Sequence, residues 1–301
     1  MSSLNSFERI VAAARGRGPV SVAVAVAQDA AIIEATRIAT DLGLVRSRLF
    51  GDARQIRPLL QQAGLARDVE VIDEADADRA ARLAVEAVHH GRAQVLVKGQ
   101  INSSNFLRAA LNAECGLRSA GILSHLAAFE IPGQRKLAFH TDGGMVVAPT
   151  LEEKRAILLN ALAALQRIGI ARPNVAVLAA NEQVSASMPA TVDAAALVEQ
   201  WKGGAFPDCV VEGPIAMDVA ASAEAAAHKG IRSTISGAVD LFLLPNIECG
   251  NLVGKTLMFY AGAKMAGVIL GATRPIVLVS RADNAQAKVN SIALACLLAP
   301  G

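Results

Sequence analysis

The stretches Asp240-Leu-Phe-Leu-Leu-Pro-Asn-Ile-Glu-Cys-Gly-Asn251 and Gly271-Ala-Thr-Arg-Pro-Ile-Val-Leu-Val-Ser-Arg-Ala-Asp283 decide the fold of this chain. Each contains an apolar run that is too short for an isolated helix and stops at small or charged residues. A buried parallel strand has this form, because it delivers the polar residues that follow it to the carboxyl edge of a sheet. The pattern predicts two such strands, with chemistry in the loop Ser280-Arg-Ala-Asp283.

Strand and helix patterns alternate outward from these two stretches. Strand-like segments at 20–27, 47–50, 69–72 and 94–98 are followed by helical patterns at 29–39, 52–63, 76–89 and 103–112. Later strands at 174–179, 208–212 and 239–244 are followed by helices at 191–201, 217–229 and 251–264, and a last helix covers 284–298. This alternation predicts mostly parallel sheets with helices on both faces.

The alternation is interrupted after Ala120. Two β-like runs at 121–131 and 136–140 are joined by Pro132-Gly133, which is typical of a hairpin. A long amphipathic helix over 150–168 follows, with Thr150 and Glu153 placed for a capping box. We predict a domain change at this point, and the length of 301 residues also favours two domains.

Composition excludes several classes of protein. A net charge of +2 and only 3% aromatic residues give no basis for a nucleic-acid surface. The 4 cysteines form no CxxC pair, so we expect reduced thiols in a cytoplasmic protein. Residues 1–17 lack the pattern of a signal peptide, and no apolar run reaches the length of a membrane helix, so we expect a soluble protein.

Common ligand-binding motifs are either incomplete or absent in this sequence. Gly250-Asn-Leu-Val-Gly-Lys-Thr256 is one residue short of a Walker A loop, which argues against an ATPase. We find neither a GxGxxG dinucleotide fingerprint nor an HExxH metal motif, and predict no NAD site and no metal. Gly250 and Asn251 are still expected at a helix N-terminus, where unpaired N–H groups favour an anion.

Polar residues at strand ends supply the candidate site. Lys98 and Gly99 follow a strand, and Arg108 lies on the helix after it. Arg118-Ser-Ala-Gly-Ile-Leu-Ser-His125 combines a cation, a hydroxyl and an imidazole near the domain change. Ser280 and Asp283 also have an ordinary interpretation, as caps of the last helix. Arg281 between them is an unusual choice for a cap, because a cation opposes the helix dipole there.

With these segments in place, the chain resembles the phosphate acetyl/butyryltransferase family, and more closely its butyryl-type branch and the transferase half of enoyl-CoA hydratase fusions. The resemblance covers 98–299. The stretches of sequence that resemble the family are Lys98-Gly-Gln100, Arg118–His125, Thr141-Asp-Gly-Gly144, Pro149-Thr-Leu-Glu-Glu-Lys-Arg155, Glu212-Gly-Pro214, His228-Lys-Gly230, Pro245–Asn251 and Ser280–Asp283.

The resemblance implies an isocitrate/isopropylmalate dehydrogenase-like fold of two α/β/α domains, with the active-site cleft between them. The first domain would comprise 1–119 plus 268–301, and the second 120–267. It also implies a homodimer, or a higher homo-oligomer, and reversible acyl transfer between coenzyme A and phosphate. Coenzyme A and acyl-CoA would be substrates, and no cofactor would be tightly bound.

The resemblance also implies the roles of individual residues. Ser280 and Arg281 would support the reacting carbonyl and the phosphoryl group during attack by the CoA thiolate. The family's proposed thiol base lies seven residues after that serine, where this chain has Ala287, so Asp283 is the nearest acid that can replace it. Val146 is a second departure, because many relatives have Asn there. The substrate-binding candidates are Lys98, Gly99, Arg108, Arg118, Ser124, His125, Asp142, Glu248, Gly250 and Asn251.

Two alternatives remain open at this stage. The departures at Ala287 and Val146 allow a CoA-binding or sensor protein that has lost catalysis. A metal-dependent dehydrogenase of the same fold would need clustered aspartates, and Asp218, Asp240 and Asp283 are not spaced like such a cluster.

Overall fold

The computed structural model describes residues 4–65, 69–278 and 283–300. The chain forms two compact units, which we call the split unit (Ser6–Gly121 and Met265–Gly301) and the central unit (Met1–Asn5 and Ile122–Lys264). The domain boundaries predicted from the sequence, at 119/120 and 267/268, stay predictions. Within the described residues, no helix is both long enough and apolar enough to span a membrane.

The split unit is built on a mostly parallel sheet with the strand order β3-β2-β1-β4-β11-β10. All its neighbouring pairs are parallel except β10–β11. Its central strands β1 and β4 are mostly apolar, as expected where helices cover both faces of a sheet. The strands are β1 (Val20–Ala25), β2 (Val45–Gly51), β3 (Val69–Asp73), β4 (Val95–Lys98), β10 (Lys264–Leu270) and β11 (Ile276–Val277).

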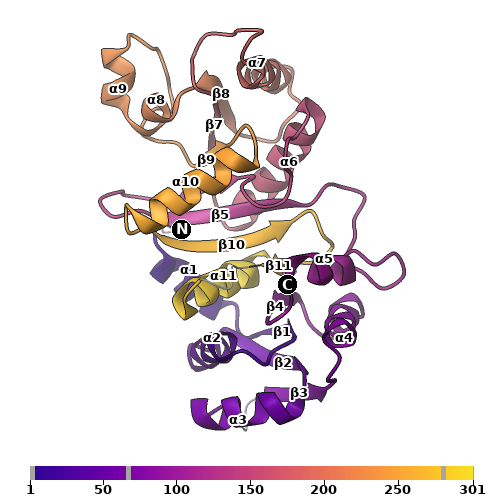
Figure 1. The fold of residues 1–301 in the computed structure, drawn as a ribbon. Coiled ribbons are helices and arrows are strands. Elements are labelled where there is room, and N and C mark those ends of the chain that lie inside the picture. Colours follow the sequence, from indigo (N-terminus) through magenta and orange to yellow (C-terminus); the bar gives the residue numbers. More distant parts are fainter. Residues whose placement is uncertain (1–3, 66–68, 279–282, 301) are drawn as a thin grey trace. The chain divides into compact units, whose positions relative to one another are not determined.

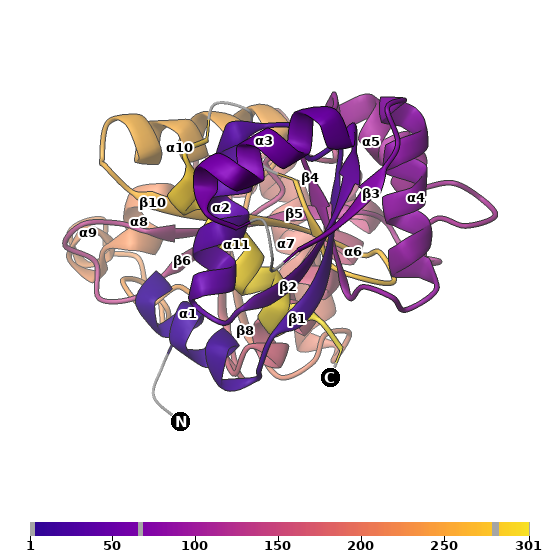
Figure 2. The ribbon, with the colours of Figure 1, turned by 90° about the horizontal axis from the view of Figure 1, so that it is seen from below.

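Helices cover both faces of this sheet (Figure 1 and Figure 2). One layer holds α1 (Phe7–Gly16), α2 (Ala30–Asp41), α3 (Ala53–Ala63) and α11 (Ala285–Leu298). The other holds α4 (Ala77–His89) and α5 (Ser103–Ala110). Helix α11 contacts α1 and α2, so the C-terminal segment packs into the core formed by the first part of the chain.

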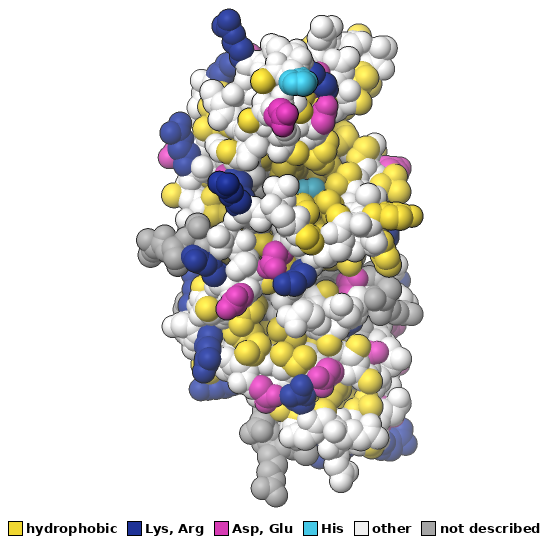
Figure 3. Space-filling model, turned by 90° about the vertical axis from the view of Figure 1, so that its left-hand side faces the viewer, with side chains coloured by type: hydrophobic (Ala, Val, Ile, Leu, Met, Phe, Trp, Pro, Cys, Tyr) yellow, Lys and Arg dark blue, Asp and Glu magenta, His cyan; other side chains and the backbone are white. Residues whose placement is uncertain are grey.

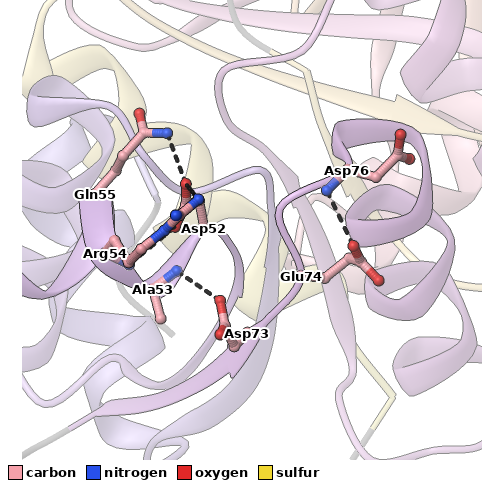
Figure 4. Close-up of polar contacts among 7 residues, drawn as sticks. All are labelled: Asp52, Ala53, Arg54, Gln55, Asp73, Glu74 and Asp76. Atoms are coloured by element: carbon pink, nitrogen blue, oxygen red, sulfur yellow. Dashed lines mark hydrogen bonds and ion pairs between the residues drawn. The ribbon is translucent and has the colours of Figure 1, made fainter.

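Carboxylates at the ends of β2 and β3 shape the loops that start the next helices (Figure 4). Asp52 caps α3 by accepting the N–H of Arg54 at 3.0 Å. Asp73 Oδ1 accepts the N–H of Ala53 at 2.9 Å, and Glu74 Oε1 accepts that of Asp76 at 3.0 Å. These N–H groups lie near the start of a helix and otherwise need water or a ligand. The acidic cluster is therefore used for local structure.

The central unit has the strand order β5-β6-β9-β7-β8. Its β5 and β6 are antiparallel and confirm the predicted hairpin, whereas β6–β9, β9–β7 and β7–β8 pair in parallel. Together with the split unit, this confirms the predicted mostly parallel α/β class. The strands are β5 (Ser124–Glu130), β6 (Ala138–Thr141), β7 (Asn174–Leu178), β8 (Val210–Ile215) and β9 (Leu241–Leu243).

Five helices flank this sheet in the described chain (Figure 1). On one side lie α6 (Leu151–Arg167) and α7 (Pro189–Lys202). On the other lie α8 (Met217–Ala221), α9 (Ala223–His228) and α10 (Ile247–Phe259). The predicted capping box of Thr150 and Glu153 is present at the start of α6. A buried cluster joins α8 and α9 to β7, β8 and β9.

Two predicted helices need correction, and a third helix was missed. The helix predicted over 217–229 is two helices, because Ser222 is extended and caps α9 by accepting the N–H of Ala225. The helix predicted over 251–264 begins at Ile247 and ends at Phe259, and Lys264 already starts β10. Helix α1 was missed, although Ser6 caps it by accepting the N–H of Arg9.

Candidate functional site

The predicted site residues are distributed over both units. Ser280 and Arg281 lie outside the described residues. Those described in the split unit are Lys98, Gly99, Arg108, Arg118 and Asp283. Those in the central unit are Ser124, His125, Asp142, Glu248, Gly250 and Asn251.

Asp142 organises the loop that follows β6. Its side chain is buried, with 2% exposure, and its carboxylate accepts the N–H groups of Gly144 at 2.7 Å, Met145 at 2.9 Å and Val146 at 3.2 Å. These bonds compensate for the cost of burying the charge. Val146 contributes its main-chain N–H here, so the side-chain departure at this position leaves the loop contact intact.

Glycines allow this loop to pack against its neighbours in the central unit. A Cβ on Gly250 would lie 2.5 Å from Cα of Gly143 and 2.6 Å from the carbonyl oxygen of Asp142. A Cβ on Gly144 would lie 3.1 Å from Cγ of His125. The structure therefore brings His125, Asp142 and Gly250 together, through a backbone contact between Gly250 and Gly143 that only glycine permits and a close contact of Gly144 with the His125 ring.

Ser124 is separated from His125 by the alternation of side chains along β5. Its fully buried hydroxyl accepts a hydrogen bond from Asn160 Nδ2 of α6 at 3.1 Å, whereas the His125 ring lies against Gly144. The same Asn160 amide donates to the carbonyl of Ile122 at 2.9 Å. Ser124 thus anchors β5 to α6, and sequence reasoning missed Asn160 as its partner.

The predicted free N–H of Gly250 is wrong. Asn246 is the N-cap of α10 and accepts the N–H of Cys249 at 2.9 Å, and Gly250 N–H donates to the carbonyl of Asn246 at 3.1 Å. The helix starts one turn earlier than predicted, so Gly250 already makes an intrahelical bond. Glu248 lies two residues before Gly250, on the opposite side of the helix, and it is exposed while Gly250 is buried. Asn251 is also exposed.

Lys98 and Gly99 lie at the carboxyl edge of the split-unit sheet. Lys98 ends β4 and is only 5% exposed. A Cβ on Gly99 would lie 2.2 Å from the carbonyl oxygen of Val26, so the close approach of the backbone that follows β1 requires glycine here. Val277 of β11 pairs with Val97 of β4. The chain after β11 therefore starts at the edge where Lys98 lies.

Arg118 lies elsewhere in the split unit. It forms an isolated bridge with Ala272, and Thr273 N–H donates to the carbonyl of Leu117 at 2.9 Å. Ala272 precedes β11, so the backbone of Arg118 lies on the amino-terminal side of that strand, whereas Lys98 follows the carboxyl end of β4. Arg108 lies in the last turn of α5.

The start of α11 corrects the predicted cap and reveals a missed residue. Asn284, rather than Asp283, is the cap, since Asn284 accepts the N–H of Ala287 at 2.9 Å. Lys288 is only 5% exposed, and its ammonium donates to the main-chain carbonyl of Asp283. The sequence could have indicated Lys288 as a candidate, because it is a lysine within a mostly apolar helix.

Metal binding has no support in the described part of the chain. There, no group of three or more His, Cys, Asp or Glu side chains is arranged to hold an ion. All four cysteines are free thiols. Burial raises the pKa of Cys209 to about 11 and that of Cys296 to about 12, so neither thiol is ionised near neutral pH.

The fold and these loops define a class of α/β proteins in which polar residues follow the carboxyl ends of mostly parallel strands. A solved structure places the fold among the phosphotransacylases. The branched-chain phosphotransacylase from Enterococcus faecalis V583 matches with a TM-score of 0.84 and 29% identity, over 93% of this chain and 100% of that chain.

Sequence relatives then define the family. Residues 68–296 match the family described as "Phosphate acetyl/butaryl transferase". Phosphate butyryltransferase from Clostridium acetobutylicum is 41% identical over 297 residues, 98% of this chain and 99% of that protein. Phosphate acetyltransferase from Thermotoga maritima is 37% identical over 293 residues, 97% of this chain and 99% of that protein. The chain belongs to the phosphate acetyl/butyryl transferase family, as the sequence resemblance indicated.

Proposed function

We propose that this protein catalyses the reversible reaction of acyl-CoA with phosphate to give acyl phosphate and CoA, with a preference for acyl groups longer than acetyl. The observation that carries the proposal is the 41% identity to a phosphate butyryltransferase over nearly the full length of both chains. A butyryl-type relative from Bacillus subtilis at 44% identity supports the preference for a longer acyl group.

In the direction of CoA acylation, the CoA thiolate attacks the carbonyl carbon of the acyl phosphate. A C–S bond forms, and the bond from that carbon to the phosphate oxygen breaks, so phosphate leaves with its electron pair. A thiol near pKa 8.5 must first lose its proton. We assign Asp283 as the acceptor of that proton because position 287 is alanine.

The charged groups have complementary proposed roles. Arg281 would bind the phosphoryl group by charge-assisted hydrogen bonds, and Ser280 would donate to the oxyanion of the tetrahedral intermediate. Lys98, Arg108 and Arg118 would add positive charge that attracts phosphate and the CoA phosphates.

The central-unit candidates have a narrower proposed role. Asp142 holds the loop after β6, and this loop packs on Gly250 and on the His125 ring. His125 and this loop would form a rigid wall of the substrate site, because several contacts fix the conformation of the loop. Ser124 is proposed to act through the placement of β5, because its hydroxyl is bonded to Asn160. Glu248 and Asn251 stay predicted binding residues on the exposed side of α10.

The test is release of CoA from butyryl-CoA, measured with a thiol reagent with and without phosphate. We expect release that requires phosphate, and a loss of about 100-fold or more in kcat for Arg281→Ala with an unchanged unfolding transition. Arg274→Ala is the matched control, because this arginine lies on the loop between β10 and β11, and it should retain wild-type activity. Near wild-type turnover by Arg281→Ala would contradict the assignment.

One observation favours a second candidate. Ala287 stands where the family's carboxylate is expected, which is compatible with a protein that binds CoA without turning it over. Isothermal titration with CoA distinguishes the two. Binding together with phosphate-dependent release supports the transferase, and binding without any release supports a CoA sensor.

A further inference from the structure

Lys288 is a charged side chain inside a buried helix. It lies near the start of α11, in which residues 287–298 are all buried, and it is only 5% exposed. Figure 3 shows several lysine and arginine side chains in their ordinary place, projecting from the surface of the molecule. Burying an ammonium group costs free energy unless an opposite charge or hydrogen bonds compensate for it. Lys288 therefore needs a compensating partner.

The partner that the structure provides for Lys288 is neutral. Its ammonium donates to the main-chain carbonyl of Asp283, and this is its only hydrogen bond to the described residues. No carboxylate in the described part of the chain forms an ion pair with it. The segment 279–282, which precedes Asp283 in the sequence, contains no acidic residue either. An ammonium has three N–H donors, so two of them can serve another acceptor.

Lys154 shows how another buried lysine of this chain is compensated. It lies in α6 and is 6% exposed, nearly as buried as Lys288. Its ammonium lies 2.6 Å from Oδ2 of Asp193 in α7, so a carboxylate neutralises its charge. Lys288 has the same burial without such a carboxylate among the described residues. The comparison indicates that an anion outside the protein supplies the counter-charge of Lys288.

The position of the ammonium also favours an anion. The Lys288 side chain reaches back five residues to Asp283, which precedes the N-cap Asn284 of α11. The N-terminus of a helix carries partial positive charge, which disfavours a cation and favours an anion. This end of α11 follows β11, whose Val277 pairs with Val97 of β4 at the carboxyl edge of the split-unit sheet. Ligands of such sheets bind at the carboxyl ends of the strands.

We propose that Lys288 is a phosphate-binding residue, and that the phosphate dianion that reacts with acyl-CoA supplies its counter-charge. The carbonyl of Asp283 fixes the ammonium, and its two other N–H donors bind phosphate oxygens by charge-assisted hydrogen bonds. The attraction is strong because the protein interior screens it less than water does. The identity of the anion rests on the proposed function, which requires phosphate as a substrate.

The first test is isothermal titration of the full-length protein with inorganic phosphate and, separately, with CoA. Lys288→Met keeps the apolar stem and removes the charge, so it should raise the Kd of phosphate by about tenfold or more. The Kd of CoA should stay within about twofold, and Lys288→Arg, which restores the charge, should recover part of the phosphate affinity. Lys202→Met is the matched control, because this lysine is exposed at the end of α7, and it should bind phosphate like wild type.

Three outcomes of these titrations would overturn the inference. They are a wild type that does not bind phosphate, a Lys288→Met protein with an unchanged Kd of phosphate, and a loss of affinity that is confined to CoA. The last outcome would assign the lysine to a phosphate group of CoA instead of the phosphate substrate.

Thermal unfolding separates a binding role of Lys288 from a structural one. Without ligand, Lys288→Met should melt at the wild-type temperature or above it, because the substitution removes a buried charge that no described carboxylate neutralises. Lys154→Met should melt at a lower temperature, because it leaves Asp193 without its cation. Phosphate should raise the melting temperature of the wild type more than that of Lys288→Met. A Lys288→Met protein that melts as low as Lys154→Met would show that the lysine is structural, contrary to the inference.

Steady-state kinetics distinguish a failure of this inference from a failure of the proposed function. Lys288→Met should raise the KM for phosphate by about tenfold or more and leave the KM for butyryl-CoA unchanged. A wild type that binds phosphate through Lys288 but releases no CoA would contradict the proposed function alone. Phosphate-dependent CoA release with the same KM for phosphate in both proteins would contradict the role of Lys288 alone.

Discussion

At the scale of single residues, His140 shows how burial sets the chemistry of a side chain. It lies in β6 with 5% exposure, and its ring centroid is 5.0 Å from that of Phe129 and 4.9 Å from that of Phe242. Its Nδ1 has no hydrogen-bond partner among the described residues. Desolvation lowers the pKa of this imidazole to about 4, so the folded protein keeps it neutral.

This pKa predicts a pH-dependent loss of stability. Between its ordinary pKa of 6.5 and the folded value of about 4, His140 binds a proton more readily in the unfolded chain. The contribution of neutral His140 to the free energy of unfolding is therefore complete above pH 6.5. It is lost as the pH falls toward 4, which lowers the free energy of unfolding by up to about 3 kcal/mol. Urea unfolding at both pH values should show a smaller acid loss for His140→Leu than for wild type. The exposed His228→Leu serves as control, and an equal loss in all three proteins would contradict the prediction.

At the scale of elements, the sequence predicted where strands and helices lie but not always where they begin. The capping box of Thr150 and Glu153 was predicted correctly, because a side-chain cap is a local interaction. Helix α10 was misplaced by a turn because Asn246, its true cap, follows Pro245 in the segment that was predicted as the loop after the strand. The short α8 and α9 were merged because nothing local in their alanine-rich sequence marks Ser222 as extended.

The glycine in the first turns of α10 gives a prediction at this scale. Gly250→Ala should lower the free energy of unfolding by about 2 kcal/mol, because its Cβ would meet the backbone of Gly143, which cannot easily move. Gly254→Ala is the matched control in the same helix. Its Cβ would meet only the tip of the Phe129 ring, and the gain in helix propensity offsets that contact, so the change should stay within about 1 kcal/mol. Equal effects in urea titrations of the two variants would be inconsistent with the close contact.

At the scale of the whole molecule, segments distant in sequence build each unit. Residues 287–298 of α11 are all buried, and α11 packs on α1 and α2 near the other end of the chain. Arg17 donates to the carbonyl of Leu297, a contact that joins the beginning of the split unit to its end. A truncation of α11 would remove part of this core, so activity assays require the full chain.

The family membership of the full chain leads to a prediction about substrate choice. Butyryl-CoA should exceed acetyl-CoA in kcat/KM by about tenfold or more, because an apolar pocket gains roughly 1–3 kcal/mol from each added methylene group. Phosphate-dependent CoA release, measured for both substrates at subsaturating concentration, provides the ratio. A ratio near one, or a preference for acetyl-CoA, would place this protein with the acetyl-named relatives instead.

The sequence by itself determined the mostly parallel α/β class, the capping box of α6 and the family, because apolar periodicity, capping and ordered motifs are properties of neighbouring residues. The tertiary structure decided which candidates face one another. It turned Ser124 toward Asn160 while His125 meets Gly144, and it buried Gly250 while leaving Glu248 exposed. The side-chain periodicity of a strand or helix places neighbouring residues on different sides of that element. Only packing between segments distant in sequence determines which side contacts another element and which side stays exposed.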